Sequence, residues 1–123
     1  MVINRTSRYH NTAFNWHAVV KKYDGNMVFV GIPEEYRTFV SEFGSELPHE
    51  KTSTLLDVAR VIAGCRLFVG NQSAPYAIAQ GLAVPTVLEV SSRFPNCLFP
   101  CSRNRYGCTT KDDLPDLSNA QAT

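Results

Sequence analysis

Residues 65–90 read CRLFVGNQSAPYAIAQGLAVPTVLEV, and this stretch decides the fold. It opens with the apolar run LFV at 67–69, which is too short for a helix and ends at a glycine, a pattern typical of a strand buried on both faces. Ser73 can cap a helix that has Pro75 in its first turn and Gly81 near its end. A second apolar run, at 86–88, predicts a second buried strand. Because the connections are short, we expect two parallel strands joined by a right-handed crossover.

The turn between the first strand and the helix is polar. Backbone N–H groups at a helix start have no intrahelical partner and carry the positive end of the helix dipole, so such turns often hold a phosphate. Gly70 lets the backbone approach a ligand closely, and Asn71, Gln72 and Ser73 can add hydrogen bonds. The same side chains can equally serve only to cap the helix, and the residues alone leave both interpretations open.

The rest of the chain repeats the alternation of strand and helix. Residues 2–4 and 27–30 predict further buried strands, and residues 45–52 can hold a short edge strand. Helices are predicted where apolar residues recur at helical spacing, at Trp16, Val19 and Val20, over residues 34–43, and along Leu55, Val58, Ala59 and Ile62.

This order of elements predicts an α/β fold, a Rossmann-like parallel sheet with helices on both faces in a single domain. We place the domain at residues 1–108, although the order fades after residue 90. We expect residues 109–123 to form a polar C-terminal tail.

Three polar turns follow predicted strands. The first holds Thr6, Ser7 and Arg8, whose hydroxyls and guanidinium suit an anion. The second, residues 31–35, ends in Glu34 and Glu35, which also suit a helix N-terminus by charge alone. The third is the turn at residues 70–73. Since ligands bind outside the carboxyl ends of parallel strands, we expect the three turns to gather into one ligand site.

The string LFVGNQSAPYAIAQGLAVPTV at residues 67–87 resembles the signature segment in the C-terminal half of heptosyltransferase-like glycosyltransferases. In that family a strand ends in Gly-Asn-Asp-Ser-Gly-Pro-Met-His, followed by an alanine-rich helix and Gly-x-Pro-Thr. The residues GIPEE at 31–35 resemble the family's Gly-x-Pro-x-Glu turn, and the turn at residues 6–8 resembles its hydroxyl-rich loop. Three positions depart from the pattern: Gln72 replaces the acid, Ala74 the glycine and Ala77 the histidine.

The resemblance implies the donor-binding half of a two-domain glycosyltransferase of GT-B type, which transfers a hexosyl or heptosyl group only with a separate acceptor and catalytic domain. It implies a nucleotide-sugar or nucleotide as ligand, with Glu34 or Glu35 on the ribose. The candidate donor-binding residues are Thr6, Ser7, Arg8, Glu34, Glu35, Asn71, Gln72, Ser73 and Tyr76. Catalytic residues stay unassigned.

Two alternatives remain open. One is a non-catalytic binding or interaction module that kept the fold and lost the donor chemistry. The other is a homodimer that rebuilds the two-domain cleft, with a carboxylate such as Glu89 supplied across the interface.

The composition narrows the function classes. A net charge of +1 without a run of Lys and Arg gives no signal for nucleic acid. No apolar stretch is long enough to span a membrane and the N-terminus lacks a signal-peptide pattern, so a cytoplasmic protein is the simplest expectation. Cys65 is expected to be a core residue, while the role of Cys97, Cys101 and Cys108 stays open. We expect neither a metal site, since no histidine lies near these cysteines to complete one, nor a cofactor.

Overall fold

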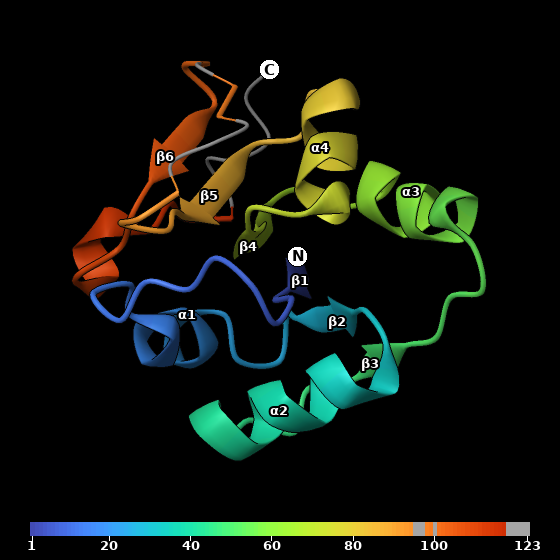
Figure 1. Cartoon of the computed structure of the whole chain (residues 1–123), viewed down its shortest axis with the longest axis horizontal. Helices are drawn as coiled ribbons and strands as arrows, with labels where there is room; N and C mark the ends of the chain where they lie inside the picture. The colour runs from blue at the N-terminus through green and yellow to red at the C-terminus, as the bar shows by residue number, and fades with distance from the viewer. Residues whose placement is uncertain (95–97, 100, 118–123) are drawn as a thin grey trace.

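Six strands form one all-parallel sheet in the order β3-β2-β1-β4-β5-β6 (Figure 1). The computed structural model describes residues 1–94, 98–99 and 101–117. The strands are β1 (Val2–Asn4), β2 (Val28–Val30), β3 (His49–Glu50), β4 (Phe68–Asn71), β5 (Thr86–Glu89) and β6 (Asn104–Tyr106). The predicted α/β, Rossmann-like parallel fold is therefore confirmed. Its strand order reverses between β1 and β4, which is the place where doubly wound folds bind ligands.

Helices cover both faces of the sheet (Figure 1). On one face, α1 (Trp16–Lys22) and α2 (Pro33–Phe43) bury an aromatic core that contains Trp16, Phe29 and Phe39. On the other face, α3 (Leu55–Ala63) and α4 (Ala74–Gly81) pack on a second core with Ile62 and Phe68. The inner strands β1, β4 and β5 are buried throughout, which explains why their sequences are largely apolar.

Local sequence explains where the helices begin. Thr54 caps α3 by accepting a hydrogen bond from the Asp57 backbone N–H at 3.1 Å, and Asp57 accepts in return from the Thr54 backbone N–H at 3.2 Å. The Ser73 hydroxyl accepts from the Tyr76 backbone N–H at 3.4 Å at the start of α4. Prolines occupy the first turns of α2 and α4, where a missing N–H leaves no helical bond unmade. The predicted Ser73 cap is thus present.

The C-terminal part differs from the expectation. Residues 104–106 form β6, which pairs with β5 although its sequence, Asn-Arg-Tyr, carries no apolar pattern. The segment 109–117, expected as part of a polar tail, packs against α1 and buries Leu114. Lys22 holds this segment by donating to the Leu114 carbonyl at 3.0 Å and pairing with Asp116 at 2.9 Å. The remainder of the expected tail, residues 118–123, lies outside the described residues.

Candidate functional site

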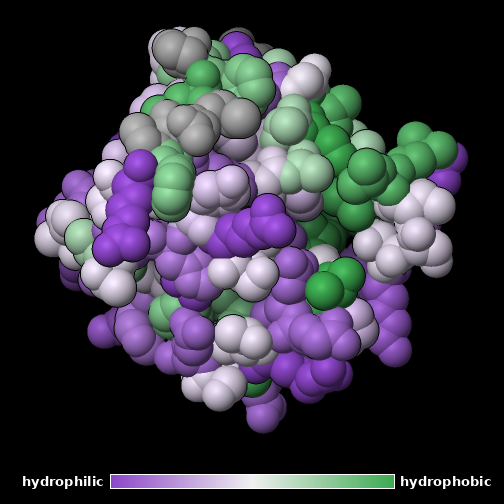
Figure 2. Space-filling model, viewed as in Figure 1, coloured by the Kyte–Doolittle hydropathy of each residue, from purple (hydrophilic) through white to green (hydrophobic). Residues whose placement is uncertain are grey.

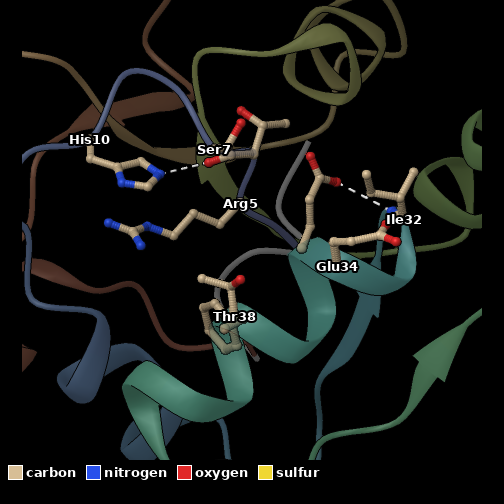
Figure 3. A pocket seen from close by; sticks show the side chains of 9 residues that line it. Arg5, Ser7, His10, Ile32, Glu34 and Thr38 are labelled. Carbon is tan, nitrogen blue, oxygen red and sulfur yellow. Dashed lines mark hydrogen bonds between the residues drawn. The ribbon is translucent and has the colours of Figure 1, made fainter.

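The loops that follow β1 and β2 enclose a small cavity at the carboxyl edge of the sheet (Figure 3). Its volume is about 150 Å³. Polar side chains from both loops line it, together with the first turns of α2: Arg5, Thr6, Ser7, His10, Ile32, Glu34, Glu35, Thr38 and Phe39. Four of the predicted site residues therefore share one cavity, although they come from two different turns of the sequence.

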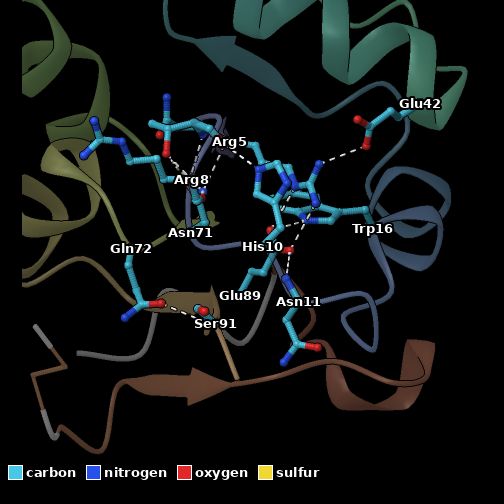
Figure 4. Close-up of polar contacts among 12 residues, drawn as sticks. Arg5, Arg8, His10, Asn11, Trp16, Glu42, Asn71, Gln72, Glu89 and Ser91 are labelled. Atoms are coloured by element: carbon cyan, nitrogen blue, oxygen red, sulfur yellow. Dashed lines mark hydrogen bonds and ion pairs between the residues drawn. The ribbon is translucent and has the colours of Figure 1, made fainter. Parts of the chain in front are cut away.

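Asn71, at the end of β4, ties the loop after β1 across the point where the strand order reverses (Figure 4). Its Oδ1 accepts from the Thr6 backbone N–H at 3.0 Å, and its Nδ2 donates to the carbonyls of Thr6 at 3.1 Å and Arg8 at 2.6 Å. Asn71 is fully buried. Its amide thus holds the loop that would contact a ligand.

Gln72 holds the loop on the other side of β4, as Asn71 holds the loop after β1. Its Oε1 accepts from the Ser91 backbone N–H and its Nε2 donates to the Phe94 carbonyl, both at 2.8 Å. Gln72 is 5% exposed and the loop that it holds follows β5 (Figure 4). The two amides after β4 therefore hold the loops of the two neighbouring strands, β1 and β5.

The start of α4 is joined to the sheet through Ser73 and Asn4. The Ser73 hydroxyl donates to Asn4 Oδ1 at 3.2 Å, and Asn4 Nδ2 donates to the Val30 carbonyl at 2.8 Å. These bonds link the ends of β1 and β2 to the first turn of α4. Ser73 is half-buried, and the following Ala74 is exposed.

Tyr76 lies in the core. It is 1% exposed and belongs to the apolar cluster between the sheet and the helices α3 and α4. Its hydroxyl accepts a hydrogen bond from the Phe99 backbone N–H at 3.2 Å, and burial raises the pKa of Tyr76 to about 12. The structure therefore places Tyr76 apart from the cavity residues.

Glu34 and Glu35 give the cavity its charge. Glu35 Oε1 accepts from the Ile32 backbone N–H at 3.2 Å, and burial raises the pKa of the Glu35 carboxyl above its usual value. The Ile32 bond opposes this shift and the like charge of Glu34 adds to it. Glu34 is exposed and lies 3.5 Å from the Arg37 guanidinium. These carboxylates can accept hydrogen bonds from the hydroxyl groups of a ligand.

Arg5 lines the cavity, but its charge is already compensated. Its Nε and Nη2 donate to the Glu89 carboxylate at 2.9 and 3.1 Å, and its Nη1 pairs with Glu42 at 2.9 Å (Figure 4). Glu89 also accepts from the Asn11 backbone N–H at 2.7 Å and from Trp16 Nε1 at 2.8 Å. Arg5 therefore anchors the loop at residues 5–11 and leaves little positive charge for a ligand.

The burial of Glu89 corrects one hypothesis. A homodimer in which Glu89 reaches across an interface requires an accessible carboxylate, but Glu89 is 0% exposed and accepts hydrogen bonds from Arg5, Asn11 and Trp16. The partners that bury it come from the opposite end of the chain.

The sequence reasoning missed an aromatic pair at this edge. The rings of Tyr9 and Phe94 lie edge to face with centroids 6.1 Å apart, and Phe94 is 52% exposed. Tyr9 has a φ of +58°, in the left-handed region that non-glycine residues rarely adopt. Arg8 is exposed beside this pair in sequence, and its side chain points away from the Arg5–Glu89 cluster (Figure 4). Phe94 follows a buried strand, which is the signal that could have identified it.

The cysteines of the described part of the chain give no metal centre. Cys65, Cys101 and Cys108 are free thiols, and burial raises the pKa of Cys65 and Cys108 above the usual value. Within residues 1–94, 98–99 and 101–117, no three His, Cys, Asp or Glu side chains converge on one point. Cys97 lies outside these ranges. None of the helices described there is long and apolar enough to cross a membrane.

Comparison with known proteins identifies no relative: no protein-family profile matches the chain, and no curated protein sequence matches it.

Proposed function

We propose that the chain binds a nucleotide or nucleotide-sugar at the carboxyl edge of the sheet, as the donor-binding half of a heptosyltransferase-like glycosyltransferase. The observation that supports this most strongly is the order of chemical groups along the edge. Carboxylates follow β2, the hydroxyls of Thr6 and Ser7 follow β1, and a helix start follows β4. Carboxylates can accept hydrogen bonds from a ribose hydroxyl pair, and a helix start can hold a diphosphate beside them.

The cavity would hold the ribose. Glu34 and Glu35 are the acceptors for its two hydroxyls, and the absence of a free cation inside the cavity disfavours phosphate there. The diphosphate would lie over Ser7, Arg8 and the first turn of α4. A cavity of about 150 Å³ is smaller than the 300–1,000 Å³ typical of whole-ligand sites, so most of the ligand would lie on the loop surface.

Sugar transfer would need a second domain. Gln72, at the position of the family's acid, brings no charge, and Ala77, at the position of its histidine, cannot donate to a phosphate oxygen. General-base assistance alone is worth about 10²–10⁴-fold. The chain would therefore bind a donor and leave catalysis to a partner domain that carries the acceptor.

Amide chemical shifts measured during titration test the binding. Uridine, adenosine and guanosine diphosphates, each with and without a sugar, should shift the backbone amides of residues 6–8 and of Ile32, Glu34 and Glu35. Glu35→Gln should weaken binding about ten- to hundredfold, because a charge-assisted hydrogen bond is lost. Glu46→Gln is the matched control, since Glu46 is an exposed carboxylate before β3, at the opposite edge. If no nucleotide shifts these amides at millimolar concentration, the proposal is wrong.

One observation favours the alternative of an interaction module. Apolar side chains gather over α3 and α4 in Figure 2, with Leu55 at 62%, Leu56 at 59% and Leu82 at 44% exposure. Residues 74–83 carry no charge, so a second copy of the chain could pack here without repulsion. Concentration-dependent dimerisation in sedimentation, abolished by Leu56→Lys, would support this function, and a monomer at all concentrations would exclude self-association through this face.

A further inference from the structure

The carboxyl edge of the sheet presents an exposed aromatic ring beyond the start of α4. Phe94 follows β5, which is the neighbour of β4 on the side away from the cavity. Its backbone is fixed twice, because its carbonyl accepts from Gln72 Nε2 at 2.8 Å and its N–H donates to Ser91 Oγ at 3.3 Å. Its ring is nevertheless 52% exposed and rests on Tyr9. A fixed backbone with an exposed ring is a typical arrangement for ligand contact.

The sheet order determines which part of a ligand could reach this ring. Along the edge the groups are the carboxylates after β2, the hydroxyls after β1, the helix start after β4 and, after β5, the ring of Phe94, which Tyr9 contacts from the loop after β1. Three spacings of about 4.8 Å separate β2 from β5, or about 14 Å in total. This distance suits a ligand of two rings joined by an extended linker, rather than a single ring.

The covalent structure of a nucleotide-sugar then determines which of its parts lies at each position along the edge. The base and the diphosphate leave opposite sides of the ribose, so with the ribose on Glu34 and Glu35 and the diphosphate toward α4, the base lies away from β5. The group beyond the diphosphate is the donor sugar. We infer that Phe94, supported by Tyr9, is the platform on which the sugar ring of a nucleoside diphosphate sugar packs. This inference rests on the proposed function and extends it to the sugar.

The backbone of Tyr9 agrees with this role. A non-glycine residue at a φ of +58° is strained, and strained residues are found where a side chain must be held in one direction. Asn71 stabilises this conformation by donating to the carbonyl of the preceding Arg8 at 2.6 Å. Asn71 and Gln72 together thus position the two members of the aromatic pair from opposite sides of β4.

The ratio of two dissociation constants tests the platform. Binding of uridine diphosphate and UDP-glucose, of adenosine diphosphate and ADP-glucose, and of guanosine diphosphate and GDP-mannose is measured by calorimetry or amide shifts. At least one sugar conjugate should bind about two- to tenfold more tightly than its diphosphate, as expected for one ring stacked on an aromatic side chain. In Phe94→Ala the two dissociation constants should become equal, while the affinity for the diphosphate stays unchanged. Phe94→Tyr, which keeps the ring, should still bind the sugar conjugate more tightly than the diphosphate.

Leu56→Ala is the control for loss of an exposed apolar side chain that belongs neither to the cavity lining nor to the Tyr9–Phe94 pair. The sugar protons of the bound conjugate should also shift upfield in the wild type and not in Phe94→Ala, because they lie over a ring. If diphosphates bind but the sugar adds no affinity, or if Phe94→Ala keeps the ratio, the platform is refuted while the proposed function stands. If no nucleotide binds, both are refuted.

Discussion

Glu89→Gln is the perturbation whose magnitude the structure predicts best. The carboxylate is fully buried and accepts four hydrogen bonds: from Arg5 Nε at 2.9 Å, Arg5 Nη2 at 3.1 Å, the Asn11 backbone N–H at 2.7 Å and Trp16 Nε1 at 2.8 Å. A glutamine keeps the shape, but it removes the charge and turns an NH₂ group toward two of these donors, because each oxygen accepts from two of them.

Breaking a buried ion pair by removing one partner costs about 3–5 kcal/mol. Arg5 keeps Glu42 at 2.9 Å, and Glu42 is 47% exposed, so part of the guanidinium charge stays compensated. We therefore expect the lower end of that range, a loss of about 3 kcal/mol of unfolding free energy. With a urea m-value of about 1–3 kcal/mol/M, the unfolding midpoint should fall by about 1–3 M.

The matched control is Glu42→Gln, which removes the other carboxylate on the same guanidinium. Because that pair is exposed on the Glu42 side, its loss should cost no more than about 1 kcal/mol. The double variant Arg5→Gln/Glu89→Gln should be less destabilised than the sum of its single variants, since no charge is left buried alone. A Glu89→Gln protein within 0.5 kcal/mol of wild type would refute the assignment of Glu89 as the anchor of residues 5–11.

Three other predictions follow from the same edge of the sheet. Asn71→Ala should lower the unfolding free energy by about 2–3 kcal/mol, because the part-buried backbone groups of Thr6 and Arg8 lose their partner, and it should accelerate hydrogen exchange of the Thr6 amide. The Glu35 carboxyl should titrate above its usual pKa in carbon-detected NMR. Since the folded state then holds the proton more tightly than the unfolded state, the contribution of Glu35 to stability should increase as pH falls through the folded-state pKa. Glu35→Gln should remove this pH dependence of the unfolding free energy. Gly31→Ala should destabilise by about 1–3 kcal/mol in urea unfolding, because the residue has a φ of +147° and a Cβ would lie 2.8 Å from Glu35 Oε1; a neutral outcome would contradict the described loop.

The fold was predictable because its signals are local. Each central strand is a short apolar run buried on both faces, and each helix starts at a cap or a proline within a few residues. The convergence of the turns after β1 and β2 also follows from parallel strands alone, since their carboxyl ends meet at one edge. The cavity shared by Thr6, Ser7, Glu34 and Glu35 shows this convergence for two of the three predicted turns, whereas no residue of the third turn, 70–73, lines it.

The direction of the buried polar side chains was not predictable in the same way. Asn71 bonds to a loop 65 residues earlier, Gln72 to a backbone 19 residues later, and Glu89 to Arg5, which is 84 residues away. Whether an amide after a strand faces a ligand or a neighbouring loop depends on such distant partners, which the local pattern does not contain. The strand β6 was missed for a related reason, because an edge strand is specified by its neighbour more than by its own side chains.

The contacts of Gln72 also change how its departure from the resembled pattern is interpreted. A carboxylate at this position could accept from the Ser91 backbone N–H, but it could not donate to the Phe94 carbonyl. Glutamine makes both bonds at 2.8 Å, so the exchange of an acid for an amide places a hydrogen bond on the loop that carries the exposed ring. The position that the resemblance suggested had lost donor chemistry thus connects β4 to the loop after β5 in the structure. Because Asn71 makes the equivalent connection to the loop after β1, the amides at the end of β4 shape the surface on which a ligand would lie, and the groups left to touch that ligand belong to the surrounding loops.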